Sequence, residues 1–230
     1  MKTIGIIGGI GPESTIDYYR KIVAAYCESD VSGNYPQIII NSINMNEMLK
    51  LIGANKFNEV ADNLVVEFEK LAAAGADFGI LASNTPHIVF DKVRDSSALP
   101  LISIVEVTCN KVKEIGLQRV ALFGTKFTMN GGFYDQVFSQ LNIQVFTPND
   151  IDQSFIHEKY LEELVKGNIQ DETKSKLLDI ASKMKKEQDI QGLILGGTEL
   201  SLILQNGDAP GIHIIDTTDA HVESILKALI

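Results

Sequence analysis

The chain has 230 residues, of which 45% are hydrophobic, enough for one large globular domain or two small ones. Its formal net charge of −10 argues against a nucleic-acid partner or an anionic membrane surface, because no basic field is available to neutralise phosphates. The longest apolar runs have the length of strands, so no membrane-spanning helix is expected, and no signal-peptide pattern follows Met1. These features predict a cytoplasmic location.

The two cysteines, Cys27 and Cys109, each lie inside a helical pattern. We expect both to be free, buried thiols, because a cytosolic compartment keeps thiols reduced. The four histidines are dispersed, and no Cys/His cluster has the spacing of metal ligands. No metal site is therefore predicted.

The first part of the chain alternates apolar, strand-like runs with segments that carry apolar residues at helical spacing. Strands are predicted at residues 3–7, 37–42, 77–82 and 101–105. Helices are predicted at residues 12–28, 57–74 and 88–94. A glycine-rich turn, residues 8–11, joins the first strand to the first helix and resembles an anion site, but it lacks the spacing of a dinucleotide fingerprint.

The pattern then restarts with a second series of strands and helices. Strands are predicted at residues 119–123, 143–146, 192–196 and 213–215. Helices are predicted at residues 106–115, 131–141, 151–165, 173–186 and 221–229. The interval from the first glycine turn to Ser83 is close to the interval from Gly124 to Gly197, which favours an internal duplication.

This repetition predicts an α/β fold of two similar, doubly wound, three-layer α/β/α domains with mostly parallel sheets. A pseudo-two-fold axis would relate the domains, and the active site would lie in the cleft between them. The first domain is predicted to comprise residues 1–100 and 207–230, and the second domain residues 101–206.

Two of the apolar runs end abruptly at small and hydroxyl-bearing residues, at Ser83 and at Gly197. In open α/β sheets ligands bind beyond the carboxyl ends of the strands, so these two turns are the expected site. His87 follows Ser83 by four positions, but no G-x-S-x-G elbow surrounds the serine, and a hydrolytic Ser–His pair is not favoured.

Four motifs occur in the order typical of one known family. They are Gly8-Gly9-Ile10-Gly11-Pro12-Glu13-Ser14-Thr15, Ser83-Asn84-Thr85-Pro86-His87, Gly197-Thr198-Glu199-Leu200 and Asp216-Thr217-Thr218. Over essentially its whole length the chain resembles the aspartate/glutamate racemases. The resemblance implies an isomerase of amino acid metabolism without a cofactor, independent of PLP, with L- or D-aspartate or glutamate as substrate. It also implies a homodimer, and a final helix that packs on the first domain.

The family resemblance implies a two-base mechanism, in which a group on each face of the substrate removes or returns the α-proton. These groups are usually two cysteines, whose positions are occupied here by Ser83 and Gly197. Met48 stands where some aspartate-specific members have an arginine, and His221 keeps a motif position. The substrate-binding residues that the resemblance implies are Gly9, Asn84, Thr85, Thr125, Thr128, Lys166, Thr198 and Glu199.

Three functions remain open from the sequence. The chain is a racemase with altered or impaired catalysis, a non-catalytic binding protein for an acidic amino acid or dicarboxylate, or a related lyase or isomerase. The absence of both thiols predicts that the chain binds L-aspartate or L-glutamate but exchanges the α-proton slowly or not at all.

Overall fold

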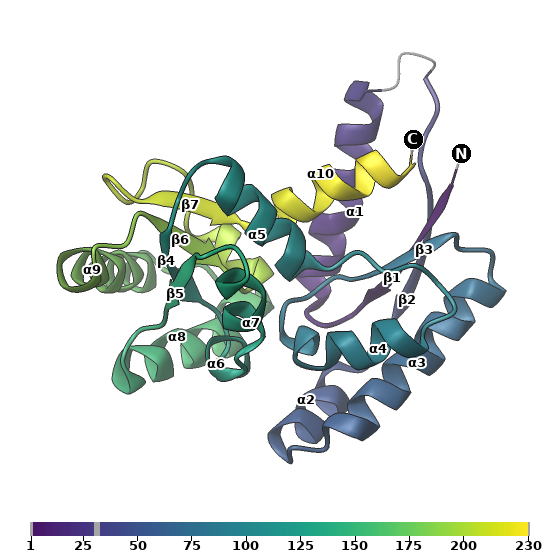
Figure 1. The fold of residues 1–230 in the computed structure, drawn as a ribbon, viewed down its shortest axis with the longest axis horizontal. Helices are drawn as coiled ribbons and strands as arrows, with labels where there is room; N and C mark the ends of the chain where they lie inside the picture. Colours follow the sequence, from purple (N-terminus) through teal and green to yellow (C-terminus); the bar gives the residue numbers. More distant parts are fainter. Residues whose placement is uncertain (1, 30–32, 230) are drawn as a thin grey trace. The chain divides into compact units, whose positions relative to one another are not determined.

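The computed structural model describes residues 2–29 and 33–229, and the chain folds into two compact units. Unit 1 comprises Met1–Ile104 and His221–Ile230, and unit 2 comprises Val105–Ala220. Each unit contains its own parallel sheet with helices packed around it, as the alternating pattern of the sequence predicts (Figure 1). None of the described helices is long and apolar enough to cross a membrane.

The sheet of unit 1 has the order β2-β1-β3, and all its strands are parallel. Its strands are β1 (Thr3–Gly8), β2 (Gln37–Ser42) and β3 (Phe78–Leu81). Its helices are α1 (Pro12–Ser29), α2 (Met45–Gly53), α3 (Phe57–Ala73) and α4 (Phe90–Ser96), preceded by the 3-10 helix η1 (Thr85–Val89). The central strand β1 is buried on both faces, which explains its unbroken apolar run.

The predicted strand at residues 101–105 is wrong. Leu101 forms a single parallel bridge with Gly79, and the chain turns into helix α5 (Ile104–Glu114) three residues later. The segment Leu101–Val105 is a short apolar run, and such a run fits a buried strand or the buried first turn of a helix equally well.

The sheet of unit 2 has the order β5-β4-β6-β7 and is also fully parallel. Its strands are β4 (Arg119–Phe123), β5 (Gln144–Phe146), β6 (Gly192–Leu195) and β7 (His213–Asp216). The predicted domain boundaries differ from the compact units chiefly at residues 207–220. That segment lies in unit 2 because β7 pairs with β6.

Unit 2 contains more helical segments than the sequence pattern predicts. They are α6 (Lys126–Asn130), α7 (Phe133–Ser139), α8 (Asp150–Glu162), η2 (Leu164–Lys166), α9 (Asp171–Gln188) and η3 (Thr198–Leu202), with α10 (Thr217–Leu229) continuing from unit 2 into unit 1. The helix predicted at residues 131–141 is α7, and α6 lies in the segment predicted as a turn, residues 124–129. Gly132, with φ of 73°, separates them in the left-handed conformation that glycine tolerates.

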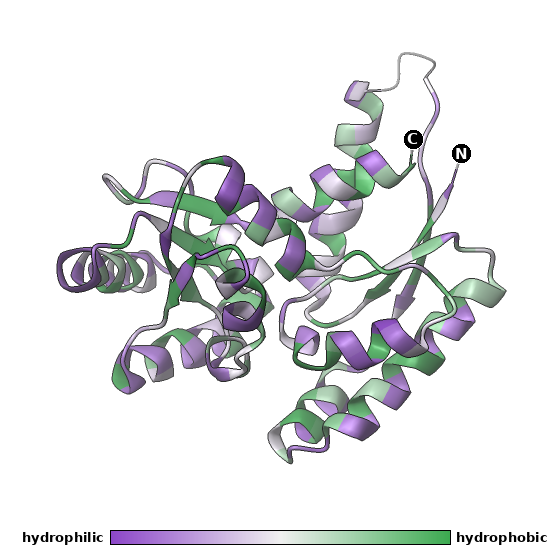
Figure 2. Ribbon diagram, in the orientation of Figure 1, coloured by the Kyte–Doolittle hydropathy of each residue, from purple (hydrophilic) through white to green (hydrophobic). Residues whose placement is uncertain are grey.

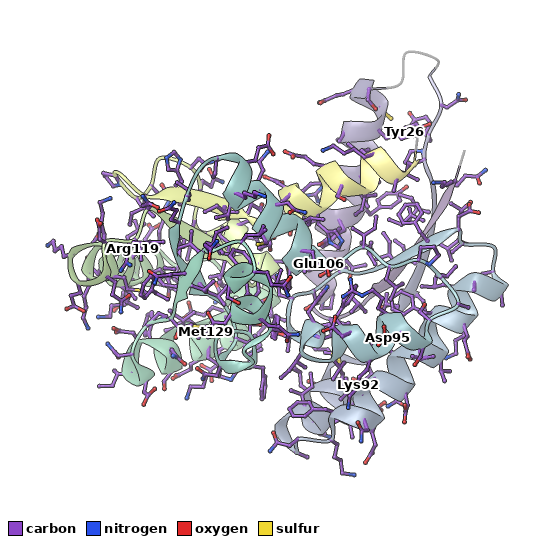
Figure 3. The ribbon with its side chains drawn as sticks, in the orientation of Figure 1. Tyr26, Lys92, Asp95, Glu106, Arg119 and Met129 are labelled. Atoms are coloured by element: carbon purple, nitrogen blue, oxygen red, sulfur yellow. The ribbon has the colours of Figure 1, made fainter. Side chains whose placement is uncertain are left out.

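The central strands β1, β4 and β6 consist mostly of apolar, buried residues (Figure 2). In unit 2, helix α8 contributes Ile156 and Tyr160 to the hydrophobic core, and their spacing of four residues places them on one helical face; Leu164 at the start of η2 joins the same core. At the start of β4, the guanidinium of Arg119 (Figure 3) donates from Nε (3.0 Å) and Nη2 (2.6 Å) to the backbone carbonyl of Gln188. Arg119 thereby joins the start of β4 to the end of α9.

Helix α8 begins at a side-chain cap, and this cap can be tested. The Oδ1 atom of Asn149 accepts hydrogen bonds from the backbone N–H groups of Ile151 and Asp152, both at 3.0 Å. Asn149→Ala is expected to lower the free energy of unfolding by about 1 kcal/mol, because two N–H groups at the helix N-terminus lose their acceptor. Urea denaturation measures this change. Asn63→Ala, at an exposed position inside α3, is the control, and equal losses for both variants would contradict a capping role.

Candidate active site

The first candidate turn follows β1 in unit 1. Gly9 has φ of 80°, and its N–H donates to Oγ1 of Thr15 (2.8 Å) in the first turn of α1. A Cβ atom at Gly9 would lie within 2.5 Å of Oγ of Ser42 and closer still to the carbonyl oxygen of Ile43. The turn therefore requires glycine, because the backbone that follows β2 lies against it.

The second turn of unit 1 comprises Ser83, Asn84 and Thr85, directly after β3. All three side chains are buried, with at most 5% of their surface exposed. Ser14 in α1 donates from its hydroxyl to the carbonyl of Ala82 (2.8 Å), so the start of α1 is joined to the end of β3. The two predicted turns of unit 1 thus lie at the same carboxyl edge of its sheet.

His87 has a structural role in this turn. Its Nδ1 donates to the backbone carbonyl of Ser83 (3.0 Å), and its Nε2 accepts from the N–H of Ile104 (3.3 Å). Burial, with a smaller effect of His221, lowers the pKa of His87 to about 3, so the ring is neutral at physiological pH. Since backbone groups bind both ring nitrogens, His87 does not act as a base toward the Ser83 hydroxyl.

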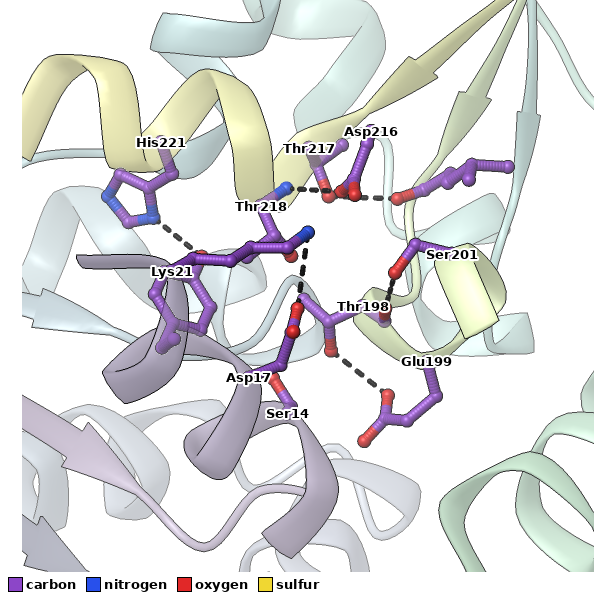
Figure 4. Close-up of polar contacts among 12 residues, drawn as sticks. Ser14, Asp17, Lys21, Thr198, Glu199, Ser201, Asp216, Thr217, Thr218 and His221 are labelled. Carbon is purple, nitrogen blue, oxygen red and sulfur yellow. Dashed lines mark hydrogen bonds and ion pairs between the residues drawn. The ribbon is translucent and has the colours of Figure 1, made fainter. Parts of the chain in front are cut away.

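His221 fixes the final helix to unit 1. Its Nε2 donates to the carbonyl of Ile102 (3.1 Å), and its Nδ1 accepts from the hydroxyl of Tyr18 (2.8 Å) in α1 (Figure 4). The ring is fully buried, and burial lowers its pKa to about 4. The packing of the final helix on the first domain, which the family resemblance implies, is confirmed by these contacts.

In unit 2, the turn after β4 is organised by two buried threonines. Oγ1 of Thr125 accepts from the N–H of Thr128 (3.1 Å) and caps helix α6, and the two hydroxyl oxygens are 3.1 Å apart. A Cβ atom at Gly124 would lie 2.8 Å from the carbonyl oxygen of Gly196. The turns after β4 and β6 are therefore in contact at the carboxyl edge of this sheet.

The turn after β6 contains the buried carboxylate of Glu199. Oε2 of Glu199 accepts from the hydroxyl of Thr198 (2.9 Å), and Ser201 donates to the carbonyl of Thr198 (2.9 Å) (Figure 4). The same Oε2 also accepts from the phenol of Tyr160. Only 1% of the surface of Glu199 and 6% of that of Tyr160 is exposed. Tyr160 comes from α8, and the sequence-based reasoning missed it because its spacing from Ile156 and Leu164 indicates only a core residue.

Tyr160 fills the space that a side chain at position 197 would need. A Cβ atom at Gly197 would lie 2.9 Å from Cζ of the Tyr160 ring, 3.1 Å from Cδ2 and closer still to Cε2. Gly197 itself has φ of −134° and ψ of 121°, an extended conformation that any residue adopts. The glycine is therefore required by the tyrosine ring and not by the backbone.

Burial and the neighbouring charge of Glu199 raise the pKa of the Tyr160 phenol well above its ordinary value. Tyr160 is therefore protonated at neutral pH, and it donates its proton to the hydrogen bond with Glu199.

The remaining candidates lie around these turns. Lys166 is exposed at the end of η2, and η2 packs against η3, which carries Thr198 and Glu199. Met48 is buried in α2 of unit 1.

Neither cysteine lies in a strand-end turn. Cys109 is free and buried as predicted, and burial raises the pKa of its thiol to about 11. Cys27 is also free, but the prediction that it is buried is wrong, because it lies exposed near the end of α1. Cys27 lies fifteen residues after Pro12, the first residue of α1, so roughly 22 Å of helix separate the two residues at 1.5 Å per residue. No group of three or more potential metal ligands occurs among the residues that the structure describes.

Comparison with known proteins identifies the protein family in which these turns occur. A family profile described as Asp/Glu/Hydantoin racemase matches residues 7–225. The chain belongs to this family. The family resemblance inferred from the four motifs is thereby confirmed, and the predicted fold of two α/β domains with mostly parallel sheets is confirmed as well.

Solved structures of related racemases share the fold over the whole chain. A putative Asp/Glu racemase from Yersinia pestis has a TM-score of 0.89 and 30% identity, and covers 100% of this chain and 99% of its own. An aspartate racemase homologue from Pyrococcus horikoshii OT3 has a TM-score of 0.85 and 33% identity, with the same coverage.

The broad specificity amino-acid racemase RacX of Bacillus subtilis is 30% identical to this family member over 151 residues. That match spans 58% of this chain and 59% of RacX.

Proposed function

We propose that this racemase-family chain binds an acidic amino acid but does not interconvert its enantiomers by the two-thiol route. Gly9, Asn84 and Thr85 in unit 1 and Thr125, Thr128 and Thr198 in unit 2 keep the hydroxyl, amide and backbone groups that suit carboxylates. Lys166 neutralises the distal carboxylate of the substrate, and Glu199 positions the turn that carries Thr198. The protein works without PLP, as a cytoplasmic homodimer.

One observation carries the proposal: the ring of Tyr160 lies where a catalytic side chain at position 197 would be. Glycine has no group that exchanges a proton, and the ring leaves no room for one. At the other position, the Ser83 hydroxyl is a far weaker acid than a thiol, and His87 does not activate it because backbone groups bind both its ring nitrogens. Neither position thus supplies a thiolate.

Calorimetric titration with both enantiomers of aspartate and glutamate tests binding, and chiral chromatography after prolonged incubation tests racemisation. Because RacX is named for broad specificity, neutral and basic amino acids belong in the same panel. We expect one of the acidic amino acids to bind, with no enantiomer conversion. Conversion of any amino acid, or binding of neutral but not acidic ones, would contradict the proposal.

The contribution of the first turn can be measured separately with Thr85→Val, which keeps the shape of the side chain and removes its hydroxyl. The expected result is a roughly tenfold weaker affinity, because one hydrogen bond to a charged carboxylate is lost. Thr147→Val, at a partly buried threonine outside the candidate turns, is the matched control. If both variants bind like the unmodified chain, the turn of residues 83–85 does not hold the ligand.

A further inference from the structure

We infer that Tyr160 and Glu199 together form a proton-transfer group that takes the place of the absent side chain at position 197. The inference rests on the proposed binding of an acidic amino acid. It assigns a catalytic role to Tyr160, which no strand-end motif contains, and gives Glu199 the role of its proton acceptor.

The placement of the phenol is the first reason. The side of the ring that approaches the Cβ position of residue 197 runs from Cδ2 through Cε2 to Cζ, the carbon that bears the hydroxyl. The phenol oxygen is one bond beyond Cζ, as the sulfur of a cysteine is one bond beyond Cβ. The acidic phenol oxygen of Tyr160 thus lies within a few bond lengths of the position that the sulfur of a cysteine at residue 197 would occupy. This position is beside the carboxyl end of β6, and ligands bind at such strand ends.

The hydrogen bonds around the phenol are the second reason. Tyr160 donates to Oε2 of Glu199, and the same oxygen accepts from Thr198 (2.9 Å). A buried carboxylate in contact with a buried phenol gives the phenol proton a defined destination. Coupled to that carboxylate, the phenol can accept a proton from carbon while passing its own proton on, which an isolated tyrosine of raised pKa cannot do at neutral pH.

The step balances as follows. The Cα–H bond of the bound amino acid breaks, and its electron pair stays on Cα, next to the α-carboxylate. The α-proton forms a new O–H bond with the phenol oxygen, and the original phenol proton passes along the hydrogen bond to Glu199. The products are a carbanion, a neutral phenol and a neutral carboxyl group, and the reverse transfers regenerate the starting state. The negative charge of the Glu199 carboxylate is replaced by the negative charge of the carbanion, so the net charge does not change.

Return of the proton occurs from the same face, because the phenol that removes the proton also returns it. The predicted chemistry is therefore exchange of the α-proton with retention of configuration. This is a half-reaction of racemisation, and it is slower than catalysis by a thiolate because the acid is weaker.

The experiment is incubation of the chain with a bound acidic amino acid in deuterated water, followed by proton NMR of the α-position and chiral chromatography. We expect slow loss of the α-proton signal without enantiomer conversion. Tyr160→Phe, which keeps the ring, and Glu199→Gln, which keeps an acceptor for the phenol, are each expected to slow exchange by at least about 100-fold. The affinity of Tyr160→Phe for the ligand should remain within about threefold of that of the unmodified chain.

Tyr134→Phe is the matched control, because Tyr134 is also a buried tyrosine of unit 2 but lies in α7, outside the turns. It should leave the exchange rate unchanged. Absence of exchange in a chain that binds its ligand overturns this inference and leaves the binding proposal intact, as does an exchange rate that Tyr160→Phe does not alter. Absence of binding overturns the binding proposal itself. Parallel losses of exchange and affinity would show a structural role for the pair and also overturn the inference.

Discussion

Gly197→Ala and Gly197→Cys are each expected to lower the free energy of unfolding by about 2–6 kcal/mol. The new Cβ atom would overlap the Tyr160 ring, and overpacking of this kind costs about 1–3 kcal/mol. Displacing the ring also removes the phenol from Glu199, which leaves a buried carboxylate with one donor fewer and adds about 1–3 kcal/mol. Urea denaturation of the three proteins, with m-values compared, measures the change.

The same two substitutions in a Tyr160→Leu background test whether overlap with the Tyr160 ring causes the loss of stability. Leucine lacks the ring atoms that approach position 197, so the added Cβ atom has room. The cost of Gly197→Ala should then fall by at least about 1 kcal/mol, a coupling typical of residues in direct contact. Equal costs in the two backgrounds would mean that the Tyr160 ring is not the obstacle.

This coupling changes how the absent thiol is interpreted. A single Gly197→Cys substitution places the new sulfur against a filled space, so a failure to restore proton exchange would not show that the position is unsuited to catalysis. The informative variant is Gly197→Cys combined with Tyr160→Leu. The double variant offers a thiol at the end of β6 with space around it, and the turns after β4 and β6 remain as they are.

The strand-end turns could be predicted from the sequence, because each depends on a local pattern. Apolar runs of four or five residues stop at Ser83 and Gly197, and an alternating β-α order makes the strands parallel, so their carboxyl ends share one edge. The partner of Gly197 could not be predicted in the same way. Tyr160 lies 37 positions earlier in the chain, at a spacing that indicates only a helix face in the core.

The errors in the predicted elements have the same origin. The segment Leu101–Val105 is too short for its apolar pattern to separate a strand from the first turn of a buried helix. The assignment of residues 207–220 depended on which strand β7 joins, and pairing between strands is a non-local property. Burial of Cys27 was inferred from a helical pattern, but it lies on the exposed side near the helix end, where neighbouring elements do not cover it.

Lowering the pH from 6.5 to 4.5 is expected to reduce the free energy of unfolding by roughly 5 kcal/mol, because two imidazoles are buried in their neutral form. Burial lowers the pKa of His87 to about 3 and that of His221 to about 4, whereas both rings in the unfolded chain titrate near 6.5. Between these values the unfolded chain binds two more protons than the folded chain. The contribution of the two neutral imidazoles to stability is therefore fully present above pH 6.5. As the pH falls below this value, each histidine lowers the free energy of unfolding by about 1.4 kcal/mol per pH unit.

Urea denaturation at half-unit pH intervals between 4.5 and 7.5 measures this slope. The window ends at 4.5 because carboxylates such as Glu67 and Asp208, whose pKa values are lowered by their lysine partners, begin to contribute below it. His221→Gln, which can still donate to the Ile102 carbonyl, should reduce the slope by about 1.4 kcal/mol per pH unit. A slope that His221→Gln does not reduce would show that protonation of this ring is not opposed by folding.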